Sequence, residues 1–229
     1  SSSNLGLTTS APAVVRVNPA ADAKASNTNA KWYMVVGSGP TGYDASVVQS
    51  AKVFAVDLAT GPGSGNSLVT SYSVGSWNSY IGDITAFDRD LDYRHDVVYF
   101  GRVIHDGALP WRGKIYRLTM GAGGATAKFG TVTSPTQWGI ASGSARVPTE
   151  MLDTFVSGAE MGPVATAPSI TMDDAANVWV FAGSGRYYSG TDKTDVSTQY
   201  FVGLKDSVLN AGCNQSAGAL NCMDNDLVD

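Results

Sequence analysis

Four aspartates in one short stretch are the side chains of this sequence best suited to binding a ligand. Residues 83–101 read DITAFDRDLDYRHDVVYFG, and the spacing D-x-D-x-D-x-x-x-D is formed by Asp88, Asp90, Asp92 and Asp96. A hard cation such as Ca²⁺ takes about six to eight oxygen ligands, and a loop with carboxylates at its first, third, fifth and ninth positions supplies most of them. The backbone carbonyl of Arg94, at the seventh position, would add another. The spacing therefore predicts a divalent-cation site.

The alternative is a solvated acidic turn that holds no ion. Carboxylates at this spacing repel one another unless a cation neutralises them, which favours the metal site. An EF-hand does not fit, because its twelfth position needs Glu and here that position is Tyr99. For His95, inside the loop, we expect an outward-facing side chain, since an oxygen-rich shell suits Ca²⁺ and not the softer ions that prefer imidazole.

One position inside the loop bears on how tightly it would bind a cation. The sixth position of such loops is usually Gly, because the chain turns sharply there, and here it is Tyr93. A bulky residue at positive φ costs on the order of 1 kcal/mol, which puts the affinity in question.

Asp173, Asp174 and Asn177 occupy a comparable place before a strand. Their spacing is degenerate, and we interpret them as a polar hairpin turn.

Apolar strand-like runs flank the acidic loop and place it in a hairpin. The 229-residue chain is rich in Gly, Ser, Thr and Val, with 43% hydrophobic and 15% charged residues. This composition favours β structure with long polar connections. No sustained helical stripe is present, and the best candidate, residues 150–156, spans barely two turns. The sequence therefore predicts an all-β fold.

One phrase recurs along the chain: an apolar strand ending in Gly, an insertion, and a second strand. Gly37, Gly101 and Gly183 mark equivalent points in WYMVVG, VVYFG and VWVFAG. These strands are apolar at successive positions, which predicts cover on both faces, as in the blades of a β-propeller. A β-sandwich, the alternative, gives cleaner alternation.

Such repeats are too few to close a ring, since propellers typically have about four to eight blades. We expect residues 1–229 to form one partial β-propeller domain, with about three to four blades' worth of a larger ring. The chain begins SSSNLG without Met, so we also expect it to be a processed or excised piece.

Charge and hydropathy restrict the partners. The formal net charge is −5, and no concentrated Lys/Arg footprint is visible, which argues against a nucleic-acid partner. No apolar run approaches the roughly 18–20 residues that span a bilayer. Cys213 and Cys222 lie among turn-forming residues. We favour a disulfide-closed loop at 213–222, in an oxidising compartment, over two unrelated thiols.

Taken in order, several phrases resemble one protein family. The chain carries, in order, SAPAVVRV, KWYMVVGSG, KVFAVDLATG, ITAFDRDLDYRHDVVYFGRV, GKIYRLTM, APSITMDDAANVWVFAGSGRYYSGTD and QYFVGLKD. This series is similar to the C-terminal propeller of the PilY-type type IV pilus tip proteins. The likeness runs over most of residues 10–207. One departure is GSGR at 183–186, where the family has G-T-G-R.

The resemblance implies a modified seven-bladed propeller of the quinoprotein-dehydrogenase-like kind, with Ca²⁺ bound in one hairpin loop and no catalysis. It implies a place at the pilus tip or outer cell surface, after export through the periplasm. Partners would be minor pilins and other tip components, and an extracellular surface or host ligand. The roles implied are pilus extension and retraction, surface adhesion and twitching motility. The implied metal ligands are Asp88, Asp90, Asp92, the Arg94 carbonyl and Asp96.

Two alternatives remain open at the level of sequence. KVFAVDLATG also resembles the A-x-D-x-x-T-G strands of quinoprotein dehydrogenases, which use Ca²⁺ to hold a quinone cofactor. Against this, the carboxylates here follow one another in one loop, and the adjacent cysteines of that family are absent. A generic carbohydrate- or host-binding propeller shares the scaffold, because fold does not determine function.

Overall fold

The computed structural model describes residues 4–23, 26–60, 68–105, 107, 110–121, 129–152, 160–206 and 227–228. In these residues the regular structure is strand apart from two short 3₁₀ helices, Pro135–Gln137 (η1) and Gly190–Thr194 (η2). The predicted all-β fold is confirmed. Residues 150–152, the described part of the weak helical candidate, belong to the strand Thr149–Leu152, which pairs with Arg112–Thr119. The predicted disulfide at 213–222 lies outside the described residues.

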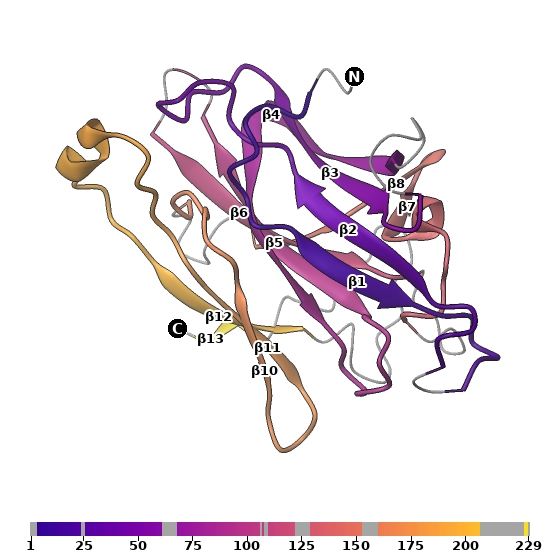
Figure 1. Ribbon diagram of the computed structural model, residues 1–229. Helices are drawn as coiled ribbons and strands as arrows, with labels where there is room; N and C mark the ends of the chain where they lie inside the picture. Colours follow the sequence, from indigo (N-terminus) through magenta and orange to yellow (C-terminus); the bar gives the residue numbers. More distant parts are fainter. Residues whose placement is uncertain are drawn as a thin grey trace.

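In the described residues the strands form antiparallel sheets of seven, four and two strands (Figure 1). The long strand β4 (Leu68–Phe87) divides the seven-stranded sheet into two units, called here the first and second sheets, and the four-stranded sheet is the third. The first sheet contains β1 (Ala13–Val17), β2 (Lys31–Gly37), β3 (Ser50–Asp57) and the first half of β4. The second contains the second half of β4, β5 (Val97–Ile104), β6 (Arg112–Thr119) and β9 (Thr149–Leu152). The third contains β10 (Ser169–Met172), β11 (Val178–Gly183), β12 (Phe201–Asp206) and β13 (Leu227–Val228). A small hairpin of β7 (Ile140–Ser142) and β8 (Ala145–Val147) lies between β6 and β9 in the chain.

The twenty-residue strand β4 joins the first two sheets. Its first half pairs with β3, as in Val53 opposite Tyr72, and its second half pairs with β5, as in Thr85 opposite Tyr99. Gly75 lies at the irregularity in the pairing with β3, shortly before the change of partner, and has φ +73°, a left-handed conformation that glycine adopts without a steric penalty. One strand therefore leaves the first sheet as its last member and enters the second as its first.

One apolar core lies between the first and second sheets, and another lies between the second and third. Val98 and Phe100 of β5 pack with Val35 and Val53 in the core shared by the first and second sheets. Val97 and Tyr99 alternate with them and face the second core, which includes Val180 of the third sheet. Every residue of β5 is buried. The prediction of cover on both faces is confirmed for this strand, because its sheet has a neighbour on each side.

That prediction is wrong for β2 and β11, whose residues alternate between buried and less buried positions. These strands belong to the first and third sheets, each of which packs against only one other sheet in the described part of the chain. Successive four-stranded sheets stacked face to face are the arrangement of propeller blades. No closed ring is formed by the described residues.

A buried polar network joins the second and third sheets. The Arg117 guanidinium of β6 forms an ion pair with Asp206 of β12, and the Tyr99 hydroxyl of β5 donates to the other oxygen of that carboxylate at 2.8 Å. Burial, followed by the adjacent carboxylate, raises the pKa of Tyr99 well above its ordinary value, so the phenol stays protonated as a donor. The network adds a buried ion pair and a hydrogen bond to the apolar contacts between the two sheets.

Within the described residues, no helix is long and apolar enough to cross a membrane.

Candidate metal centre

The acidic loop connects β4 to β5, so two paired strands hold both of its ends. The N–H of Asp96 donates to the carbonyl of Phe87 at 2.9 Å, which closes the hairpin below the loop. The carboxylate of Asp88 accepts hydrogen bonds from the N–H groups of Asp92 (3.2 Å) and Tyr93 (2.7 Å). The first aspartate thus shapes the loop by satisfying backbone donors, as Asp commonly does in turns.

Two residues of the loop adopt left-handed backbone conformations. Leu91 has φ +53° and Tyr93 has φ +67°. The positive φ expected at the sixth position is therefore confirmed, with a large side chain in the place that such loops usually give to glycine. The Tyr93 side chain is exposed, so the strain arises from the backbone and not from packing.

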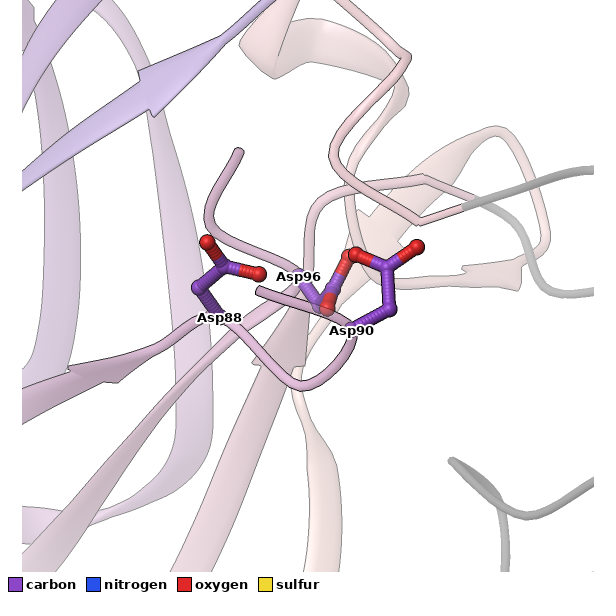
Figure 2. A group of neighbouring side chains, drawn as sticks. All are labelled: Asp88, Asp90 and Asp96. Atoms are coloured by element: carbon purple, nitrogen blue, oxygen red, sulfur yellow. The ribbon is translucent and has the colours of Figure 1, made fainter. Parts of the chain in front are cut away.

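Three of the predicted ligands converge. Asp88, Asp90 and Asp96 each offer a carboxylate oxygen, and these oxygens all lie within 4.8 Å of one another. Figure 2 shows the three carboxyl groups turned toward a common region. Asp96 is buried, Asp88 is half-buried and Asp90 is exposed, so the group has a closed side against the sheet and an open side toward solvent.

The chemistry of the donor set fits a hard cation. Burial is the main cause that raises the pKa of Asp96 to about 7; a hydrogen bond from the N–H of Arg89 opposes it, and the carboxylates of Asp90, Asp88 and Asp92 add to it. Placing three carboxylates this close is unfavourable unless protons or a cation neutralise them. Oxygen ligands of this kind suit Ca²⁺, with the rest of the shell supplied by carbonyls or water.

Asp92 is not part of the converging group. Its Oδ2 accepts a hydrogen bond from Nη1 of Arg94 at 2.6 Å, its Oδ1 accepts one from the Arg94 N–H at 3.1 Å, and both side chains are buried. The Arg94 guanidinium also donates to the carbonyls of Asp22 (2.8 Å) and Pro19 (3.4 Å). The pair therefore ties the acidic loop to residues 19–22, which follow β1.

His95 is half-buried and does not face outward as expected. Its ring Nδ1 accepts a hydrogen bond from the backbone N–H of Arg16 at 3.0 Å. The backbone N–H of His95 donates to the Arg16 carbonyl at 2.9 Å. Burial is the main cause that lowers the pKa of His95. Because Nδ1 is an acceptor, the neutral ring carries its proton on Nε2. The imidazole thus pairs with the edge strand β1, and the negative charge of Asp88 opposes the lowering of its pKa.

Sequence reasoning missed one residue that shapes the site. Gly130 has φ +73°, and a Cβ added there would lie 2.7 Å from Cβ of Arg94 and 3.0 Å from the His95 carbonyl oxygen. Its carbonyl accepts from the Asn18 N–H at 3.2 Å. The backbone of residue 130 therefore presses against the acidic loop. The only sequence signal was an isolated glycine thirty-four residues after Asp96, too remote to connect with the loop.

The predicted hairpin turn near β11 is present. The Asp173 carboxylate accepts hydrogen bonds from the N–H groups of Ala175 (3.0 Å) and Asn177 (2.9 Å), the Asn177 amide (2.8 Å) and Nε1 of Trp179 (3.0 Å). These hydrogen bonds hold the turn together and occupy both carboxylate oxygens of Asp173. In the described residues the group of carboxylates placed to hold a metal is that of Asp88, Asp90 and Asp96.

The fold and this loop together define an all-β, propeller-type chain of stacked four-stranded sheets with an acidic hairpin between two of its strands. Among solved structures the chain is similar to the C-terminal domain of PilY1 from Pseudomonas aeruginosa, with a TM-score of 0.61 and 19% sequence identity over 95% of this chain. The chain spans only 42% of the length of that structure. The similarity confirms the fold that the ordered phrases predicted. No protein-family model and no curated protein matches the sequence.

Proposed function

We propose that this chain is a propeller segment of a type IV pilus-associated protein, and that residues 88–96 bind Ca²⁺ through Asp88, Asp90 and Asp96. The convergence of three carboxylates within 4.8 Å supports the cation site. The pilus role is supported by the ordered family phrases together with the shared fold over 95% of the chain. The role is non-enzymatic, at the pilus tip or outer surface, in contact with minor pilins and with an extracellular surface.

The cation would act as a cross-link. Bound Ca²⁺ supplies positive charge that relieves the repulsion among the carboxylates and holds the loop in one conformation. The loop is already connected to residues 19–22 through Arg94 and to β1 through His95. Order in the loop is thereby transmitted to the edge of the first sheet, where a tip partner would sense it.

No observation favours the quinoprotein alternative over this proposal. The three converging carboxylates come from a single loop, whereas a quinone site draws its ligands from several blades.

The pilus role is testable in the organism that encodes the chain. Deleting the gene is expected to reduce surface pili and twitching, and the full-length wild-type gene should restore both. A full-length gene with Asp88→Asn and Asp96→Asn should restore neither to the parental level, whereas one with Asp195→Asn, an exposed aspartate in another loop, should act as wild type. Unchanged pili and twitching in the deletion strain would contradict the pilus role.

A further inference from the structure

The acidic loop also contacts the third sheet, through a side chain that is not among the candidate ligands. The guanidinium of Arg89 donates from Nη2 to the backbone carbonyl of Ala176 at 3.2 Å. Ala176 lies in the turn between β10 and β11, 87 residues further along the chain. This hydrogen bond therefore connects the loop between β4 and β5 to the first hairpin of the third sheet.

The place of Arg89 in the loop makes its backbone sensitive to a bound cation. Arg89 lies between Asp88 and Asp90 in the chain. Its backbone N–H donates to Oδ2 of Asp96 at 2.8 Å. These three aspartates are the converging carboxylate group. A cation that holds the three carboxylates together would restrain the Arg89 backbone on both sides, so less conformational entropy would be lost when the side chain binds the turn.

The turn holds its acceptor in place independently of Arg89. Ala176 has φ +62°, and its N–H donates to the Asp173 carbonyl at 2.9 Å. The Asp173 carboxylate accepts from the N–H groups on either side, those of Ala175 and Asn177. The direction of the Ala176 carbonyl is therefore set within the turn, and the contact depends on the order of the Arg89 side chain.

We propose that Arg89 is a positioning residue that couples the cation site to the third sheet. Ca²⁺ bound in the acidic loop holds the β10–β11 turn against the loop, and the docked turn in return strengthens Ca²⁺ binding. The coupling rests on the proposed Ca²⁺ site. Because coupling between two sites is reciprocal, both effects have the same factor. Arg94 makes the corresponding contact with residues 19–22 on the side of the first sheet, so the loaded loop would connect all three sheets.

The test is amide hydrogen exchange of isotope-labelled protein, followed by NMR with and without CaCl₂, together with calorimetric titration. In the parent, saturating Ca²⁺ should slow exchange at residues 175–177 by about fivefold, the lower end of typical couplings. Residues 190–194, which follow β11 at its other end, are the internal control and should not change. The N–H of Asp22, which donates to the Pro19 carbonyl, reports on the contact through Arg94.

Two variants distinguish an anchoring role from a purely electrostatic one. Arg89→Met should abolish the response at residues 175–177, preserve the response at Asp22 and weaken Ca²⁺ binding by the same factor of about five. The direction is diagnostic, because the loss of a positive charge beside a cation site would by itself tighten binding. Lys193→Met removes an exposed cation at the other end of the third sheet and should match the parent in every measurement.

The outcomes separate the coupling from the site on which it rests. Ca²⁺ binding by the parent without a response at residues 175–177, or a response that persists in Arg89→Met, would overturn the coupling and leave the Ca²⁺ site standing. Tighter Ca²⁺ binding by Arg89→Met would show that Arg89 acts through its charge, and would also overturn the coupling. No saturable Ca²⁺ binding by the parent would overturn the proposed site and the coupling together.

Discussion

Arg94 and Asp92 form an ion pair of 2.6 Å between Nη1 and Oδ2, with both side chains almost completely buried two residues apart in the acidic loop. The pairing separates two roles that the spacing of the aspartates did not distinguish. Asp88, Asp90 and Asp96 converge as a candidate cation site, whereas Asp92 orients the arginine that ties the loop to residues 19–22.

This division of roles predicts how the pair responds to substitution. Removing one partner of a buried ion pair leaves an uncompensated charge and typically costs about 3–5 kcal/mol. Arg94→Met should therefore lower the free energy of unfolding by that order, measured by urea denaturation. The double variant Asp92→Asn with Arg94→Met should recover part of the loss. Additive losses in the double variant would show that the two side chains do not interact.

Gly130 provides a test of the contact between the acidic loop and the segment that follows β6. A Cβ added at residue 130 would lie 2.7 Å from Cβ of Arg94. The backbone there is left-handed, a conformation that costs an L-residue roughly 1–2 kcal/mol. Gly130→Ala should thus destabilise the protein by at least that order and weaken Ca²⁺ binding. Gly143→Ala is the matched control, because Gly143 also has positive φ but nothing within 4 Å of an added Cβ. Equal effects of the two substitutions would mean that backbone strain alone, and not contact with the loop, is responsible.

Asp206 is predicted to be a principal polar link between the second and third sheets. Its carboxylate is fully buried against Arg117 and the Tyr99 hydroxyl. Asp206→Asn leaves the Arg117 charge uncompensated and should cost about 3–5 kcal/mol. Tyr99→Phe removes one hydrogen bond and should cost only about 1–3 kcal/mol. Thermal and urea unfolding of both variants measure this order, and a larger loss for Tyr99→Phe would contradict the central place of the carboxylate.

The turn at Asp173 predicts a dependence of stability on acid. Hydrogen bonds from the Trp179 indole and the Asn177 side chain hold the pKa of Asp173 at about 2, below the value of about 3.9 of an unfolded chain. A lowered pKa adds stability that is fully present above about pH 4 and is lost as the pH falls through 2. Asp173→Asn should reduce the slope of stability against pH in that window, measured by urea unfolding at a series of pH values. An equal slope in the variant and the parent would refute the assignment.

The sequence predicted the strands better than their arrangement in space. Runs such as VVYF were recognisable because consecutive apolar residues indicate burial on both faces, and β5 is buried throughout. WYMVV and VWVF have the same pattern, yet β2 and β11 bury one face. Local composition does not record how many sheets pack on a strand. The continuity of β4 through both sheets also had no local signal.

The candidate site was predicted in part for a similar reason. The spacing of the aspartates identified the loop, and the positive φ of Tyr93 followed from its position. The pairing of His95 with Arg16 and the approach of Gly130 to the loop bring together segments 34 or more residues apart. The spacing also did not show that Asp92 binds Arg94 instead of joining the other carboxylates. Such contacts are determined by the tertiary fold, which motif spacing does not describe.

The central claim is that Asp88, Asp90 and Asp96 hold Ca²⁺, and calorimetric titration of the purified chain with CaCl₂ tests it most directly. The parent should bind one equivalent with Kd on the order of 10⁻⁴ to 10⁻³ M, as extracellular calcium modules do. Asp96→Asn, shown to be folded by circular dichroism, should bind at least about tenfold more weakly because a charged ligand is lost, and Asp195→Asn should match the parent. No saturable heat in the parent, or equal affinity in the Asp96 variant, would contradict the account.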